Sequence, residues 1–181
     1  MVWTVHADSG IPYVIASFHG DTNGLATVPV LDSLVQGLQK DPHLRDHRLI
    51  FGLDANTYAT TDGGGGKKQD VLEWAAHCNS LGYTSCWGDT PNPHNYTTYN
   101  MRTYLQPQLN KACRKGDHAC AAADINPKDF ILFPQGEFQV IRTIKDNTGK
   151  LEYMEGTAFP TLDFPSDHGL LSTIIRDVSH K

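Results

Sequence analysis

The chain contains 181 residues, 39% of them hydrophobic, and carries a formal net charge of −5. This length and composition indicate one globular domain or a large part of one. The negative balance argues against a protein that holds nucleic acid mainly through a broad positive surface. It leaves open an enzyme that cleaves phosphate esters, because a bound divalent cation supplies positive charge locally inside an acidic protein.

The first part of the chain predicts a strand, a helix and a second strand. Residues 12–18 form an apolar, β-branched run that ends at the polar, glycine-rich sequence HGDTNG, which is typical of a buried strand. After it, apolar residues recur at helical spacing from near Pro29 and stop before Pro42. A second apolar strand is expected at about residues 48–53. This order of elements favours an α/β layered fold.

The four-glycine run in TTDGGGGKKQ does not match a phosphate-binding P-loop. Lys67 is followed by Lys68 instead of Ser or Thr, and the glycine spacing of that motif is missing. A loop is therefore expected there, followed by a helix that stops at Gly82. Three more strands are expected near the C-terminus, the first two joined by the turn PQG: residues 129–133, 137–144 and 169–177.

Four cysteines occur as two local couples, Cys78 with Cys86 and Cys113 with Cys120. The even count and the sequon at Asn95 favour an oxidising, secretory or extracellular location with disulfides. Buried thiols are the alternative. A zinc site at Cys113, His118 and Cys120 is also conceivable, but its spacing matches no recognised ligand pattern and a fourth ligand is not evident.

Polar, reactive residues stand at or just beyond one end of four predicted strands. Loops at strand ends are held by a rigid sheet, and α/β folds place their chemistry there. Each residue alone has a simple structural explanation, such as a turn or a hydrogen-bonded histidine. Their joint occurrence indicates a site formed by His19, Asp54, Asn56, Asp129, Asp167 and His168.

A serine-hydrolase site is disfavoured for the adjacent residues Ser166, Asp167 and His168. Neighbours in an extended chain point to opposite faces, so the hydroxyl and the imidazole cannot meet with an acid behind the histidine. The nucleophile motif G-x-S-x-G is also absent from the sequence.

Five segments together resemble a known family: ASFHGDTNG, LIFGLDANTY, NYTTYN, KDFILF and FPSDHGLLS. Their order and separations are similar to those of the C-terminal half of the endonuclease/exonuclease/phosphatase superfamily, which is DNase I-like. The resemblance runs from about residue 12 to 176. It implies half of a four-layer sandwich with a mixed sheet and flanking helices. Residues 1–181 would then be a partial domain, and residues 101–127 an insertion loop.

The resemblance also implies a chemistry: hydrolysis of a phosphate ester by in-line attack of water, with Mg²⁺ or Mn²⁺. His168 would be the general base, and Asp129 would fix its tautomer and orientation. Asp167 would face the metal. Three further residues would orient the water and the phosphate or donate to a phosphoryl oxygen: Asp54, Asn56 and His19.

The substrate expected from the resemblance is a phosphate ester: a nucleic acid, a nucleotide, an inositol phosphate or a lipid head group. Candidate substrate contacts lie in or beside the NYTTYN segment, at Thr98, Asn100 and Arg102. The basic segment NKACRKGDH either contacts a phosphate backbone or is simply solvated.

The sequence departs from the family at its beginning. Family members carry, near their own N-termini, an Asn and then a Glu that is the principal metal ligand, and no such pair precedes His19 here. Three interpretations remain: a fragment of a longer enzyme, a chain that pairs with itself or with another chain, or a binding and assembly domain without catalysis. In each, a wide apolar sheet surface needs a covering partner.

Overall fold

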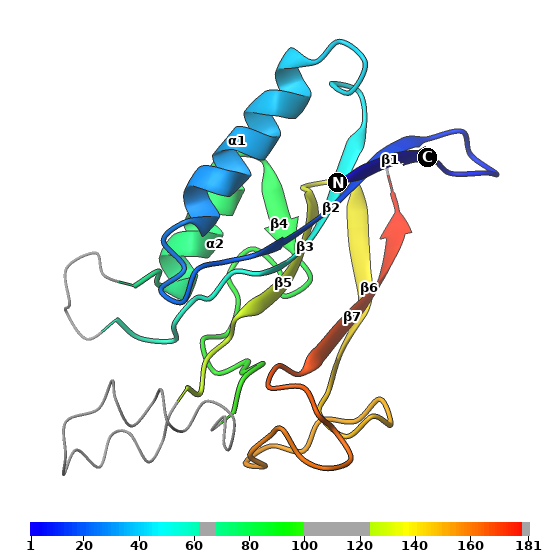
Figure 1. Ribbon diagram of the computed structural model, residues 1–181. Helices are drawn as coiled ribbons and strands as arrows, with labels where there is room; N and C mark the ends of the chain where they lie inside the picture. The colour runs from blue at the N-terminus through cyan, green and yellow to red at the C-terminus, as the bar shows by residue number, and fades with distance from the viewer. Residues whose placement is uncertain (62–67, 100–123, 179–181) are drawn as a thin grey trace.

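The computed structural model describes residues 1–61, 68–99 and 124–178. Figure 1 shows two helices against one side of a curved sheet and a separate pair of strands on the other side. Within the described residues, no helix is long and apolar enough to cross a membrane. The elements in chain order are β1 (Val2–Val5), β2 (Pro12–His19), α1 (Thr27–Lys40), β3 (Arg48–Asp54), α2 (Val71–Ser80), β4 (Tyr83–Ser85), β5 (Asp129–Pro134), β6 (Phe138–Asp146) and β7 (Leu170–Asp177).

The larger sheet has five strands in the order β1-β2-β3-β5-β4. Strands β2 and β3 are parallel and the other neighbours are antiparallel. The sheet is therefore mixed, as the sequence predicts, and the expected β-α-β unit is formed by β2, α1 and β3. The register places His19 opposite Asp54 and Asp54 opposite Asp129, which brings three candidate site residues to one end of the sheet.

The main core lies between this sheet and the two helices. Alternate residues of the central strands point toward the helices and are fully buried, as Leu49 and Phe51 are in β3. Helix α1 presents Leu31, Val35 and Leu38 at helical spacing to the same core. Each such side chain, when fully buried, contributes roughly 1.5–3 kcal/mol to folding.

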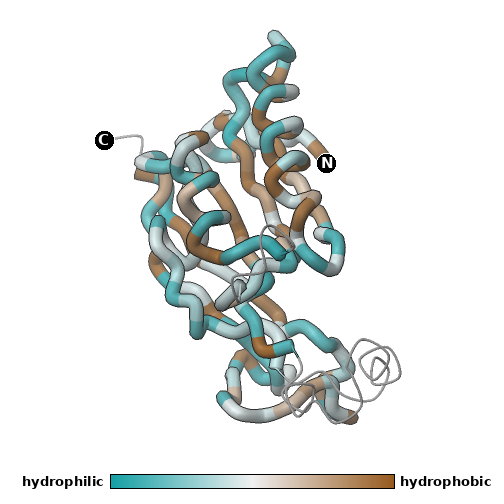
Figure 2. The backbone as a smooth tube through the Cα atoms, turned by 90° about the vertical axis from the view of Figure 1, so that its left-hand side faces the viewer, coloured by the Kyte–Doolittle hydropathy of each residue, from teal (hydrophilic) through white to brown (hydrophobic). Residues whose placement is uncertain are grey.

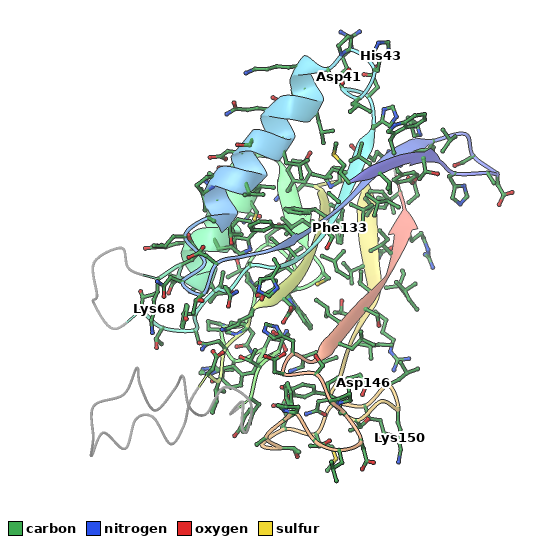
Figure 3. The ribbon with its side chains drawn as sticks, viewed as in Figure 1. Asp41, His43, Lys68, Phe133, Asp146 and Lys150 are labelled. Carbon is green, nitrogen blue, oxygen red and sulfur yellow. The ribbon has the colours of Figure 1, made fainter. Side chains whose placement is uncertain are left out.

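The two strands joined by the turn PQG are present, but they do not pair with each other. Strand β5 has β3 on one edge and β4 on the other, so neither edge is free for β6. The turn therefore carries the chain out of the first sheet, and β6 pairs with β7 in a second, two-stranded sheet. Phe133 and Phe138 pack edge-on between the two sheets at a ring distance of 5.8 Å (Figure 3).

The sheet surface away from the helices is only partly covered. Strand β1 is exposed along its whole length, and its Val2 and Trp3 are 60% and 70% exposed. The neighbouring Ile15 of β2 is 46% exposed on the face opposite the core. In Figure 2, hydrophobic residues follow the strands and helices while the loops are mainly hydrophilic. An exposed apolar edge strand is a surface that can pair with another chain.

The local cysteine couple Cys78 and Cys86 is not a disulfide in the structure: both residues are buried free thiols. Cys78 lies on the core face of α2, and it packs there as a small apolar side chain. Burial raises the pKa of each thiol to about 12. The other couple, Cys113 and Cys120, lies outside the described residues, as does His118.

Candidate active site

Asp54 and Asp129 meet because β3 and β5 are antiparallel. Asp54 is the last residue of β3 and Asp129 the first of β5, so the end of one strand lies beside the beginning of the other. His168 comes from the loop that precedes β7 in the second sheet. One ligand atom from each of these three side chains lies within 4.8 Å of the other two.

His168 and Asp129 form a hydrogen-bonded dyad, with Nδ1 and Oδ2 separated by 2.8 Å. An ionised carboxylate only accepts, so Nδ1 carries the proton and Nε2 is left for chemistry. Burial by itself lowers the pKa of His168, but the hydrogen bond to Asp129 and the negative charges of Asp129 and Asp54 outweigh it, so the pKa is raised. The resemblance implies a bond between these two residues, and their predicted roles as general base and orienting acid stay predictions.

Asp54 lies between two histidines. Its Oδ2 is 3.7 Å from Nε2 of His168 and 3.6 Å from Nε2 of His19, whose side chain is 81% exposed. Burial raises the pKa of the Asp54 carboxyl, and repulsion from Asp129 adds to the effect against the attraction of His168. Because the pKa of Asp54 is raised, a further positive charge near it would stabilise the ionised carboxylate.

Asn56 lies beneath Asp54 and is almost fully buried. Its backbone has a φ of 48°, in the left-handed region that Asn tolerates better than most residues. Its Nδ2 donates to Asp54 Oδ2 at 3.1 Å and to the carbonyl of Gly20 at 3.0 Å. Both amide protons are therefore bonded within the protein, and the structure shows Asn56 holding Asp54. Its predicted role in orienting water and phosphate stays a prediction.

Asp167 is half-buried and does not join the group formed by Asp54, Asp129 and His168. Its negative charge also raises the pKa of His168, although less than Asp129 and Asp54 do. Its predicted role as metal ligand is not tested by this geometry.

Thr98 is fully buried, and its hydroxyl is bonded to the backbone of Asn126, with distances of 3.1 Å from the nitrogen and 3.3 Å to the carbonyl oxygen. This placement does not support the predicted substrate contact, because the hydroxyl is withdrawn from solvent. Asn100 and Arg102 lie outside the described residues.

Thr97 is a site residue that the sequence reasoning missed. Its Oγ1 accepts from the backbone N–H of Lys128 at 2.9 Å and of Asp129 at 3.1 Å. Its carbonyl accepts from the N–H of Gly169 at 2.7 Å. Thr97 thus ties the segment of Asp129 to the segment of His168. Its position within NYTTYN was the available signal.

The three clustered side chains line a cleft of about 690 Å³ between the first sheet and β7. Apolar side chains such as Leu53 and Leu171 line the same cleft, together with Asp146 at the end of β6. Figure 3 shows Asp146 where β6 passes into the long loop before β7. A cleft with apolar walls and a few convergent polar groups is the usual setting of an active site.

The same three side chains could hold a metal ion. Asp54 and Asp129 offer carboxylate oxygens and His168 an imidazole nitrogen, which are ordinary metal-ligand atoms. The raised pKa of Asp54 reflects burial and a nearby carboxylate, and a cation in the cleft would relieve both.

Comparison with solved structures finds similarity at low sequence identity. The human Nocturnin catalytic domain with a bound sulfate anion gives a TM-score of 0.50 and 17% identity over 95% of this chain and 51% of that chain. The fold is of the DNase I-like type. D. rerio TDP2 complexed with a single-strand DNA product gives a TM-score of 0.46, with 13% identity over 93% of this chain and 58% of that chain. A D. rerio TDP2 humanized by 14 mutations gives a TM-score of 0.45, with 15% identity over 93% of this chain and 56% of that chain.

The similarity to Nocturnin confirms the layered α/β fold that the sequence predicts, and at 17% identity it shows the fold alone. The chain spans about half the length of that structure, with 51% of it covered. No protein-family model matches the chain, and no curated protein matches its sequence.

Proposed function

We propose that this chain carries the hydrolytic part of a metal-dependent phosphoesterase. The observation that supports the proposal is the His168–Asp129 dyad in a cleft that also contains Asp54. Oδ2 of Asp54 lies 3.7 Å from Nε2 of His168. A shared fold with the Nocturnin catalytic domain, which holds a sulfate anion, agrees with it, because sulfate has the shape and charge sign of phosphate.

In this proposal His168 takes a proton from the attacking water at Nε2. Asp129 keeps the proton on Nδ1 and stabilises the imidazolium that forms. Exposed His19, beside Asp54, donates to a non-bridging oxygen of the phosphate. Asn56 keeps Asp54 in place through its amide.

Asp54 is the carboxylate that we assign to Mg²⁺ or Mn²⁺, since Asp129 is already bonded to His168. Asp167 remains the proposed second ligand. When bound, the cation neutralises charge on the phosphoryl oxygens and favours ionisation of water. Further acidic ligands would come from the structure that covers the exposed sheet surface.

We assign that covering role to the N-terminal half of a longer enzyme, with a second copy of this chain as the alternative. The exposed strand β1 and Ile15 favour a covering element, and so does the half-length match to Nocturnin. The substrate is a phosphate ester, and nucleic acid, nucleotide, inositol phosphate and lipid head group all remain candidates.

A second candidate function is a binding or assembly domain that retains the fold without catalysis. It is favoured by the small set of acidic ligands around Asp54 in the described residues. In that case the cleft would bind a phosphate ester without cleaving it.

The two functions are separated by assaying the 181-residue chain, joined to its covering half, with Mn²⁺ on bis(p-nitrophenyl) phosphate and p-nitrophenyl phosphate. We expect Mn²⁺-dependent hydrolysis that falls about 10²- to 10⁴-fold in His168→Ala. The matched control is His43→Ala, because His43 is exposed beyond the end of α1, far from Asp146 (Figure 3). Hydrolysis that persists in His168→Ala would contradict the proposal. Calorimetric Mn²⁺ binding without any hydrolysis would favour the binding domain.

A further inference from the structure

Lys128, which precedes Asp129, is a buried lysine whose side chain is only 4% exposed. Its Nζ donates to Oδ1 of Asn56 at 3.0 Å and to Oδ2 of Asp124 at 2.7 Å. The ring of Tyr58 lies 5.3 Å from the same nitrogen, within range of a cation–π interaction. An ammonium has three protons; two are donated to these oxygens, and burial keeps the nitrogen away from solvent.

The contact with Lys128 decides how the Asn56 amide is oriented. A lysine can only donate, so the amide must turn its oxygen toward Nζ. That orientation sends Nδ2 to Oδ2 of Asp54 and to the carbonyl of Gly20. In the flipped orientation two donors would face each other, and Asp54 would lose one of its hydrogen bonds.

The same lysine connects two backbone positions of unusual conformation. Asn56 and Asp124 have φ values of 48° and 52°, both in the left-handed region. Conformations of this kind persist only when surrounding contacts hold them. The backbone of Lys128 adds two contacts, accepting from the N–H of Ala55 at 2.7 Å and donating to Thr97 Oγ1 at 2.9 Å.

We propose that Lys128 is a positioning residue for the site, acting through the amide of Asn56 to hold Asp54, with Asp124 as its counter-ion. The inference rests on the proposed function, because it assigns a role within the same site. A buried ammonium without a carboxylate beside it would be costly, and the ion pair with Asp124 at 2.7 Å offsets that cost. Asp124 is therefore connected to Asp54, at the end of β3, through Lys128 and then Asn56.

The kinetic test uses Lys128→Met, which keeps the length of the side chain and removes its donors. We expect kcat to fall about 10- to 100-fold with KM within about twofold, because Lys128 contacts no substrate. In an Asn56→Ala background the same substitution should cost less than about twofold, since its route to Asp54 is already broken. The control is Lys40→Met at the exposed end of α1.

Two results would overturn the inference. A rise in KM with unchanged kcat would mean that Lys128 contacts the substrate. Fully additive losses in the double variant would mean that it supports the fold independently of Asn56. If Lys128→Met does not fold, Lys128→Gln can still donate to Asn56, and Asp124→Asn still accepts from Lys128. Both are expected to retain more activity than Asn56→Ala, and the inference fails if they do not.

A readout that needs no catalysis separates this inference from the proposed function. The side-chain amide protons of Asn56 are expected to exchange slowly with solvent in the unmodified chain, as measured by ¹⁵N NMR. Lys128→Met should speed their exchange more than tenfold and shift their resonances, while Lys40→Met should change neither. If the chain joined to its covering half hydrolyses no phosphate ester yet this response is seen, the proposed function fails and the positioning contact stands. Unchanged Asn56 signals in Lys128→Met would overturn this inference and would not bear on the proposed function.

Discussion

Nδ1 of His168 donates to Oδ2 of Asp129 across 2.8 Å, although the two residues are 39 positions apart in the chain. Asp129 opens β5 in the first sheet, and His168 precedes β7 in the second. This bond selects one tautomer of the imidazole and presents Nε2 to Asp54.

The rate of hydrolysis should depend on the ionisation of His168. Its pKa is raised above the ordinary value of 6.5, so as a base it works only when the pH exceeds that raised value. Asp129→Asn removes the main stabilising partner of the imidazolium, and the acidic limb of the pH profile should move to lower pH while the maximal rate falls. Profiles of kcat/KM against pH for both proteins measure this. An unmoved limb would contradict the role of the dyad.

The same bond should make stability depend on pH. Because the pKa of His168 is raised on folding, its stabilisation is fully present below 6.5 and is lost as pH rises through the folded value. The free energy of unfolding should therefore decrease over this window, and less so in Asp129→Asn. Urea unfolding at a series of pH values tests it. Equal slopes for the two proteins would count against the prediction.

Asp146 should stabilise the loop between β6 and β7. Its Oδ1 accepts from the backbone N–H groups of Thr148 and Gly149 at 2.7 and 2.8 Å, and its Oδ2 from that of Leu151 at 2.9 Å. Burial alone raises the pKa of Asp146, but these bonds outweigh it and lower the pKa to about 2. Its stabilisation is therefore present above the ordinary value of 3.8 and lost as pH falls through about 2.

We expect Asp146→Ala to reduce the free energy of unfolding by about 2–4 kcal/mol, because the N–H donors lose a charged acceptor. Urea unfolding at neutral pH measures the loss. Asp8→Ala, in an exposed turn, is the control and should change stability by less than about 0.5 kcal/mol. Equal effects of the two substitutions would contradict the role of Asp146.

Cys78 and Cys86 should resist thiol reagents in the native protein. Burial raises the pKa of each to about 12, and the thiolate is the reactive form. Peptide mapping after alkylation at about pH 8 should show both cysteines modified only after unfolding. Recovery of a peptide in which Cys78 is cross-linked to Cys86 would refute the structure at this point.

The isolated chain should self-associate through its exposed strand. Trp3 and Val5 of β1 are 70% and 53% exposed, and β1 has a neighbour on one edge only among the described strands. Replacing both by Lys should shift the chain toward monomer in sedimentation velocity. Leu162→Lys, at a fully exposed loop position, is the control. A chain that is already monomeric at high concentration would show that this surface needs no partner.

The sequence predicted the parts of the fold that depend on local pattern. The buried strands β2 and β3 and the apolar face of α1 follow from the spacing of residues such as Val14, Leu31 and Phe51. The pairing of the strands was less predictable, because it depends on which strand edges are already occupied by strands that are distant in the sequence. Strands β1 and β4 are short, and β4 alone closes the edge of β5 that a simple hairpin would have used.

Within the site, the sequence predicted the residues that carry charge at strand ends, namely Asp54, Asp129 and His168. It did not predict how deeply their neighbours are buried. Lys128 would ordinarily be assigned to the surface, and only the structure shows its ammonium among Asn56 and Asp124. The hydroxyl of Thr98 was expected at the substrate, and burial gives it a structural bond to Asn126 instead.

The closed edges of β5 have a consequence for how the dyad forms. Because β6 cannot join the first sheet, the loop that carries His168 leads into a second sheet, which contacts the first through pairs such as Phe133 with Phe138 and Thr143 Oγ1 with the carbonyl of Cys86. Asp129 and His168 therefore meet only where the two sheets pack on each other, so the dyad is a product of tertiary packing and not of strand pairing.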